Sequence, residues 1–139
     1  MSFIEFLQHN LMLVTMVVAS GIMLLWPMIG RRFSGVNDVG TLEATQLINH
    51  KDAMVLDVRE DSEFASGRIP RSKHIPLGQV ANRIQELDKF KDKPIVVSCR
   101  SGNRSSSACV ALRKHGFTQV YNLRGGMIAW EQANLPVEK

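Results

Sequence analysis

Cysteine is scarce in this sequence, and the two cysteines present fit neither a disulfide framework nor a metal site. Cys99 and Cys109 are the only cysteines among 139 residues. A turn and an expected helix separate them, which places them poorly for a disulfide. They form no CxxC or Cys/His pattern of the kind that binds zinc. We therefore expect no metal site and two reduced thiols, as in a cytosolic protein, where a cysteine can be reactive.

Dense basic tracts, internal repeats and low-complexity segments are also missing. The chain carries 17 Lys and Arg against 13 Asp and Glu, a net charge of +4. This modest excess favours anionic ligands or an anionic membrane surface. Without a Lys/Arg tract or interleaved aromatic residues, it does not predict nucleic-acid binding. The length allows one compact domain, and 45% apolar with 22% charged residues is a globular composition.

Formal charge is nearly absent from the first thirty residues, where Glu5 is the only charged side chain. Residues 11–29, LMLVTMVVASGIMLLWPMI, have none. As a helix this stretch is roughly 28 Å long, close to the roughly 30 Å of bilayer hydrocarbon. Trp26 lies near one end, as interfacial anchors do, and Arg31 and Arg32 follow directly. The pattern predicts a single transmembrane helix.

A cleaved signal peptide and a buried core helix are the two alternatives to this anchor. A signal peptide normally has a basic start and a small-residue cleavage site. Here MSFIEFLQHN contains no Lys or Arg, and WPMIGRRF is a poor cleavage site. A core helix is expected to show an amphipathic pattern, which this stretch lacks. The positive-inside rule places Arg31, Arg32 and the chain after them in the cytoplasm, with a short N-terminus outside. The expected localisation is a membrane, as a single-pass protein, with a bacterial inner membrane as the expected kind.

The remainder of the chain alternates between strand and helix patterns. Short apolar runs predict buried strands at 53–58, 94–98 and 119–123. Helical patterns occupy 41–50, 61–67, 77–90, 105–116 and 126–133. This alternation predicts an α/β fold with a central parallel sheet flanked by helices. The expected organisation is a short N-terminal tail (1–10), a transmembrane helix (11–29), a linker (30–40) and an α/β domain (41–137).

The clearest strand, PIVVS, runs directly into CRSGNRSSSACVAL. Ligands of open α/β sheets bind at the carboxyl ends of strands. Backbone amides and a helix N-terminus there favour anions and lower the pKa of a thiol. Cys99 is thus a candidate nucleophile, in a candidate anion-binding loop formed by Arg100, Ser101, Gly102, Asn103, Arg104 and Ser105. A buried inert cysteine before an ordinary polar turn is the alternative, and the spacing of Cys99 and Arg104 favours the functional interpretation.

Residue chemistry assigns roles within this loop. Gly102 relieves steric limits on the turn, Asn103 tolerates left-handed dihedrals and bonds back to the loop, and Ser105 caps the helix or donates to the loop. Arg104 is placed to neutralise an oxyanion. Two supporting residues lie at the carboxyl end of another strand, on the same edge of the sheet as the loop, either as a scaffold or in contact with substrate: Asp57 and Arg59.

CRSGNRS resembles the active-site loop of the rhodanese-like family of sulfurtransferases. Cys99 stands at the position of the sulfur-carrying cysteine and Arg104 at the closing arginine. VLDVREDSEFASGRIP resembles the family's N-terminal strand and turn, and LRGGMIAW its C-terminal Gly-Gly…Ala-Trp element. The family's common Gly-His-Ile-Pro-Gly-Ala turn reads GRIPRS here, with Arg68 and Arg71 in place of His and Gly. Together these motifs cover most of residues 41–137.

The resemblance implies a rhodanese-like fold and sulfur transfer by double displacement, without a metal or organic cofactor. Cys99 takes the outer sulfur of a small anionic donor such as thiosulfate as a persulfide, and a thiol or protein acceptor removes it. Phosphatases and arsenate reductases with a related loop typically have five residues between Cys and Arg, whereas this chain has four. The shorter ring suits sulfur better than a tetrahedral oxyanion. The alternative function is a membrane-anchored interaction module whose thiol chemistry is incidental.

Overall fold

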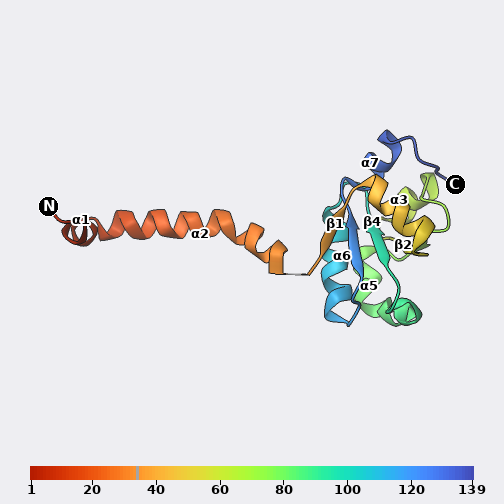
Figure 1. The fold of residues 1–139 in the computed structure, drawn as a ribbon, viewed down its shortest axis with the longest axis horizontal. Helices are drawn as coiled ribbons and strands as arrows, with labels where there is room; N and C mark the ends of the chain where they lie inside the picture. Colours follow the sequence, from red (N-terminus) through yellow and green to blue (C-terminus); the bar gives the residue numbers. More distant parts are fainter. Residues whose placement is uncertain (34) are drawn as a thin grey trace. The chain divides into compact units, whose positions relative to one another are not determined.

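The computed structural model describes residues 1–33 and 35–139, and of residues 30–33 the backbone alone. Ser34, within the expected linker, lies outside the described residues. So do the side chains of Arg31 and Arg32, on which the expected orientation depends. The chain forms two compact units, Met1–Ser34 and Gly35–Lys139 (Figure 1).

The first unit consists of two helices, α1 (Phe3–His9) and α2 (Leu11–Phe33). The Ser2 hydroxyl accepts from the Glu5 amide and the Glu5 carboxylate accepts from the Ser2 amide, so a capping box starts α1 where only a tail was expected. Within α2, Leu11–Ile29 has a mean hydropathy of 2.1, and none of it is buried. The structure thus confirms one N-terminal apolar helix that is long enough to cross a membrane.

The second unit is an α/β domain built on a parallel sheet of five strands, as the sequence predicts. The strand order is β1-β5-β4-β2-β3, and every neighbouring pair is parallel. The strands are β1 (Asn37–Val39), β2 (Met54–Asp57), β3 (Lys73–His74), β4 (Ile95–Ser98) and β5 (Val120–Leu123). Because β4 is the middle strand, the loop after it lies at the centre of the sheet's carboxyl edge.

Successive side chains of the strands enter two separate hydrophobic cores, one on each face of the sheet. Val55 of β2 and Val96 of β4 belong to one core, whereas their neighbours Leu56 and Val97 belong to the other. The first face is covered by α3 (Thr41–His50) and α7 (Gly126–Gln132). The second face is covered by α5 (Leu77–Arg83), the 3-10 helix η1 (Ile84–Phe90) and α6 (Asn103–Lys114). The prediction of a sheet flanked by helices is confirmed.

Three local features differ from the sequence-based expectation. Asn37–Val39, expected in the linker, forms the edge strand β1 through backbone pairing with β5, and only one of its side chains is buried. The single helix expected over 77–90 is α5 followed by η1. Finally, α6 begins at Asn103 and its N-cap is Gly102, so Ser105 lies inside the helix and does not cap it.

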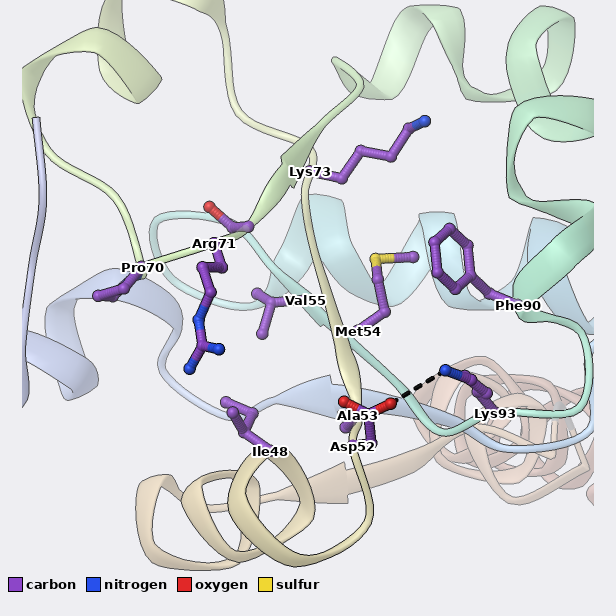
Figure 2. A pocket seen from close by; sticks show the side chains of 11 residues that line it. Ile48, Asp52, Ala53, Met54, Val55, Pro70, Arg71, Lys73, Phe90 and Lys93 are labelled. Carbon is purple, nitrogen blue, oxygen red and sulfur yellow. Dashed lines mark hydrogen bonds and ion pairs between the residues drawn. The ribbon is translucent and has the colours of Figure 1, made fainter.

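The two ends of the sheet carry different chemistry. At the carboxyl end, the Cys99 loop follows β4 between the ends of β2 and β5. At the amino end, the residues around the start of β2 border a cavity of about 360 Å³ (Figure 2). The loop after α4 (Asp61–Ser66) also reaches this second end, through Pro70, Arg71 and Ser72.

Candidate active site

Cys99 directly follows β4, and its side chain is fully buried. The Gly102 amide donates a hydrogen bond to Sγ at 3.0 Å, and the Ser105 hydroxyl lies 3.3 Å from Sγ. Burial raises the pKa of the Cys99 thiol. Hydrogen bonds from the Ser105 hydroxyl and from the amides of Ser105, Gly102 and Ser101 outweigh burial and hold that pKa below its ordinary value. The loop therefore stabilises a thiolate.

The loop reverses direction at Gly102. Its φ of +107° lies in the left-handed region, which glycine adopts without the steric penalty of a Cβ. The left-handed position expected at Asn103 thus belongs to Gly102, and Asn103 is the exposed first residue of α6. Arg100 and Ser101, expected in the anion-binding loop, are also exposed. The reversal brings the Gly102 amide into contact with Sγ.

The N-terminus of α7 holds the same loop through its backbone carbonyls. The Met127 amide donates to the Cys99 carbonyl at 2.8 Å, and the Ile128 amide donates to the Arg100 carbonyl at 3.1 Å. A Cβ added to Gly126 collides with both carbonyl oxygens, so only glycine allows this approach. The first turn of a helix leaves its backbone amides without partners inside the helix, and these two contacts supply partners for the amides of Met127 and Ile128. They also fix the orientation of the peptide groups around Cys99.

Ser105 is held by Asn122 of β5. Its hydroxyl donates to Asn122 Oδ1 at 2.5 Å, and the Asn122 amide donates to the Gly102 carbonyl at 3.2 Å and to the Asp38 carboxylate at 3.0 Å. A hydroxyl has one proton, so Cys99 Sγ and Asn122 compete for it. Sequence reasoning missed Asn122 and Asp38. The available signal was the amide side chain between Tyr121 and Leu123 in the strand VYNL, since a buried amide needs partners.

Arg104 binds a carboxylate of the protein itself. Its Nη1 and Nη2 atoms donate to Oε1 and Oε2 of Glu63 at 2.7 and 3.0 Å. The hydrogen bonds and charge of Arg104 lower the pKa of Glu63 to about 2. The guanidinium expected to clamp an anion therefore joins the start of α6 to α4. Sequence reasoning missed Glu63, because no local spacing links it to Arg104.

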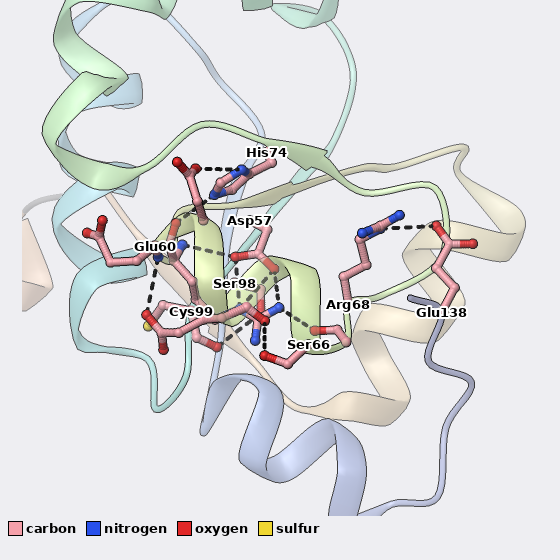
Figure 3. A network of polar contacts seen from close by, with 12 residues as sticks. Asp57, Glu60, Ser66, Arg68, His74, Ser98, Cys99 and Glu138 are labelled. Carbon is pink, nitrogen blue, oxygen red and sulfur yellow. Dashed lines mark hydrogen bonds and ion pairs between the residues drawn. The ribbon is translucent and has the colours of Figure 1, made fainter.

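Asp57 and Arg59 form a buried ion pair next to the loop. Arg59 Nη2 lies 2.8 Å from Asp57 Oδ2 and also donates to the Gly67 carbonyl at 2.6 Å. Only 1% of Asp57 and 5% of Arg59 is exposed. Figure 3 shows Asp57 beside Ser98 and Cys99, in agreement with the β2–β4 register. Of the two roles considered for this pair, the contacts are those of a scaffold.

The remaining residues singled out by the sequence are Cys109, Arg68 and Arg71, and they lie outside the Cys99 loop. Cys109 is buried in the core on the α6 side of the sheet, and burial raises the pKa of its thiol. The Arg68 guanidinium lies 4.5 Å from the centre of the Phe64 ring, and Arg71 lines the cavity at the amino end of the sheet. Across residues 1–33 and 35–139, no group of three His, Cys, Asp or Glu side chains is arranged to hold a metal ion.

The fold and the site together define a class. A hydrogen-bonded cysteine in a tight loop at the carboxyl edge of a parallel sheet is a candidate nucleophile for group transfer. Residues 41–133 match the sequence profile of the family described as Rhodanese-like domain. The chain belongs to this family.

Similar proteins agree with this assignment. A protein named Sulfurtransferase from Allochromatium vinosum is 38% identical over 103 residues, which cover 73% of this chain and 94% of that protein. Thiosulfate sulfurtransferase GlpE from Pseudomonas syringae is 40% identical over 88 residues, covering 63% and 81%. The crystal structure of a rhodanese-related protein from Thermoplasma volcanium matches with a TM-score of 0.64 and 32% identity, covering 73% of this chain and 97% of that one.

These coverages also bear on the independence of the domain. The match spans nearly all of the Allochromatium vinosum protein and of the solved Thermoplasma volcanium chain. Chains that consist of little more than this domain therefore exist and fold. Together with the compactness of Gly35–Lys139, this supports independent folding of the domain.

Proposed function

We propose that this chain is a sulfurtransferase that carries a sulfane sulfur as a persulfide on Cys99. The observation that carries the proposal is the set of hydrogen bonds on Cys99 Sγ, which lowers the pKa of a buried thiol. A thiolate is the nucleophilic form of cysteine. Relatives named Sulfurtransferase and Thiosulfate sulfurtransferase support the reaction class and thiosulfate as the donor.

In the first step, the Cys99 thiolate attacks the outer sulfur of thiosulfate. A new S–S bond forms at Sγ while the S–S bond of the donor breaks, and sulfite leaves with the bonding electron pair. The negative charge moves from Sγ to the terminal sulfur of the persulfide. Amides and a hydroxyl that point into the loop stabilise charge in both states, as in other anion-stabilising sites.

In the second step, a nucleophilic acceptor attacks the terminal sulfur. The acceptor is a thiolate in the cell or cyanide in an assay. The Cys99–sulfur bond breaks, the acceptor keeps the sulfur, and the electron pair returns to Sγ as a thiolate. Since Cys99 is fully buried, both partners need a local movement of the groups that cover Sγ. No redox partner enters the balance, because each step is a displacement.

Intact mass spectrometry tests this proposal directly. Residues 35–139 incubated with thiosulfate and freed of excess donor gain about 32 Da, the mass of one sulfur on the nucleophile. Cys99→Ser gains nothing, whereas Cys109→Ser, which removes the buried second thiol, gains the same mass as wild type. An unmodified wild type that retains its fold and still binds a membrane protein contradicts the enzyme proposal and favours an interaction module.

We further propose that α2 anchors this domain in a membrane, with the domain in the cytoplasm. The support is the length and hydropathy of Leu11–Ile29, together with Arg31 and Arg32 behind it. The full chain is then expected to stay in the membrane fraction after alkaline extraction. Protease added outside intact cells leaves the domain whole and digests it only after the membrane is opened. Digestion in intact cells contradicts the cytoplasmic orientation.

A further inference from the structure

The cavity at the amino end of the sheet is built from side chains of both polar and apolar character. Its volume of about 360 Å³ lies within the range of small-molecule sites. Apolar side chains at the start of β2 and near the ends of α3 and η1 form much of its wall. The lining consists of Ile48, Asp52, Ala53, Met54, Val55, Pro70, Arg71, Ser72, Lys73, Phe90 and Lys93.

Of the three cationic side chains that line this cavity among the described residues, two lie close to a carboxylate and one does not. Lys93 Nζ lies 3.0 Å from Asp52 Oδ2, and Lys73 Nζ lies 3.7 Å from Glu86 Oε1. Among the described residues, the Arg71 guanidinium has no carboxylate or hydrogen-bond partner. Figure 2 shows this guanidinium reaching towards Ile48 and Val55, while Lys73 points away from it. As the described residues line it, the cavity therefore presents the exposed Arg71 guanidinium, which has no carboxylate partner, beside apolar side chains.

The backbone at Arg71 is in a conformation that an arginine adopts only at a cost. Its φ is +62°, in the left-handed region, which disfavours a residue that carries a Cβ. The Arg71 amide donates to Glu138 Oε1 at 3.1 Å, which holds the turn in place. Glycine fits the same turn without this cost. An arginine side chain here is thus projected over the cavity from a position where the backbone favours glycine.

We propose that this cavity binds an organic anion that carries an aromatic or aliphatic body, with its carboxylate on Arg71. The planar guanidinium matches a carboxylate in a bidentate geometry. The hydrocarbon part packs against Ile48, Val55 and Met54. The site is separate from the Cys99 loop, because Met54 at the cavity and Asp57 beside Cys99 are three residue steps apart along β2, about 10 Å of strand.

NMR titration of ¹⁵N-labelled residues 35–139 with 2-naphthoate tests the site. We expect saturable shifts of the amides of Met54, Val55 and Lys73, and none of comparable size at Gly102 or Ser105. Two comparison compounds test the contributions of the carboxylate and of the apolar body to binding separately. Neutral 2-naphthalenemethanol lacks the charge and inorganic phosphate lacks the apolar body, so both are expected to bind at least about tenfold more weakly.

Arg71→Gly is the informative variant, because it removes the guanidinium and relieves the backbone. Its unfolding midpoint is expected to equal or exceed that of wild type, while its affinity for 2-naphthoate falls about tenfold or more. Lys114→Gln removes a positive charge from the exposed end of α6. This control is expected to change the affinity by less than about twofold, because Lys114 does not line the cavity and its exposed charge is screened.

Four results overturn the proposal. They are the absence of saturable shifts, shifts centred on the Cys99 loop, equal binding of the neutral compound, and undiminished affinity in Arg71→Gly. None of them bears on the mass change that tests sulfur transfer, so the two proposals fail or stand independently.

Discussion

Two opposing effects act on the Cys99 thiol. Complete burial disfavours a charged sulfur, whereas the Ser105 hydroxyl and three backbone amides favour it. The amides belong to the loop and cannot be removed by substitution, but the hydroxyl can. Ser105 is also the only one of these donors shared with a second acceptor, Asn122. The pKa of Cys99 is therefore most easily altered through Ser105.

Ser105→Ala is expected to raise the pKa of Cys99, because burial persists when a donor to the thiolate is lost. Thiolate absorbance at 240 nm, measured against Cys99→Ser over a pH series, reports the midpoint directly. We expect the wild-type midpoint below the ordinary value for cysteine, and the variant midpoint above that of wild type. Ser107→Ala, at an exposed position of α6, is the matched control. Equal midpoints in Ser105→Ala and wild type contradict this role.

The Glu63–Arg104 pair makes stability depend on acid pH. Glu63 has a pKa of about 2 in the folded chain against 4.5 ordinarily. Its contribution to the unfolding free energy is therefore complete above about pH 4.5 and is lost as pH falls towards 2. Urea unfolding over this range is expected to show the difference between wild type and Glu63→Gln shrinking with acid. The amplitude is modest, because 27% of the Glu63 side chain is exposed.

A double-mutant cycle isolates this pair from other acidic groups. In an Arg104→Met background, Glu63→Gln is expected to have little effect on stability at neutral or acid pH. A pH-dependent difference that persists in that background shows that another partner controls Glu63.

For single residues, the sequence predicts a role where the residues that act together lie close in the chain. Cys99 was identifiable because a strand, a thiol and a helix follow one another directly, and the Asp57–Arg59 pair lies within three residues. Glu63 was not identifiable, and the polar position of Asn122 in its strand did not reveal its partners. Their contacts with Arg104 and Ser105 cross between elements that are far apart in the chain, and the strand order that brings them together is a property of the folded sheet.

Among the elements, α7 contacts the Cys99 loop through backbone groups. Gly126 has a φ of +53°, and a side chain there overlaps the Cys99 and Arg100 carbonyls. Because those carbonyls are backbone groups, a collision cannot be relieved by turning a side chain. Displacement of either element changes the position of the amides that face Sγ.

Gly126→Ala is therefore expected to lower thiosulfate:cyanide sulfurtransferase activity, as kcat/KM, by at least about tenfold, since misplaced donors lose their effect on the reacting charge. Gly78→Ala is the control. Gly78 lies in α5 with open space around it, so alanine there is expected to leave activity unchanged and to stabilise the helix by about 0.5–1 kcal/mol. Wild-type activity in Gly126→Ala means that the loop does not depend on this contact.

The elements with a clear apolar pattern were the ones the sequence predicted well. β2, β4 and β5 have two or more buried apolar residues each, and their runs stand out. β1 buries only Val39, and β3 has two half-buried residues, Lys73 and His74. Such strands form through backbone pairing with a neighbour already in place. Hydrophobic periodicity does not reveal them.

For the molecule as a whole, the separation into Met1–Ser34 and Gly35–Lys139 predicts independent stability of the domain. Removal of residues 1–34 is expected to shift the thermal midpoint of the domain by less than about 4 °C, the effect of at most about 1 kcal/mol in a domain of this size. Circular dichroism of residues 35–139 in buffer, compared with the full chain in detergent, measures this. A larger fall shows that the first unit supports the fold.

Removal of residues 1–34 is also expected to change the solubility of the chain. The truncated chain is expected to remain in solution without detergent, because Leu11–Ile29 is the long apolar segment of the described chain. Its persulfide is expected to form as in the full chain, since every group in contact with Cys99 Sγ lies within the domain. Loss of the persulfide on truncation assigns part of the site to residues 1–34.

The contact between α7 and the loop also has a consequence for biosynthesis. Met127 and Ile128 hold the Cys99 and Arg100 carbonyls, and the ribosome adds them roughly 30 residues after Cys99, a few seconds later at about 5–20 residues per second. During that interval the thiol is on a nascent chain without the fixed peptide groups that acidify it. The peptide groups around Cys99 are therefore fixed by α7 only after translation has passed that helix.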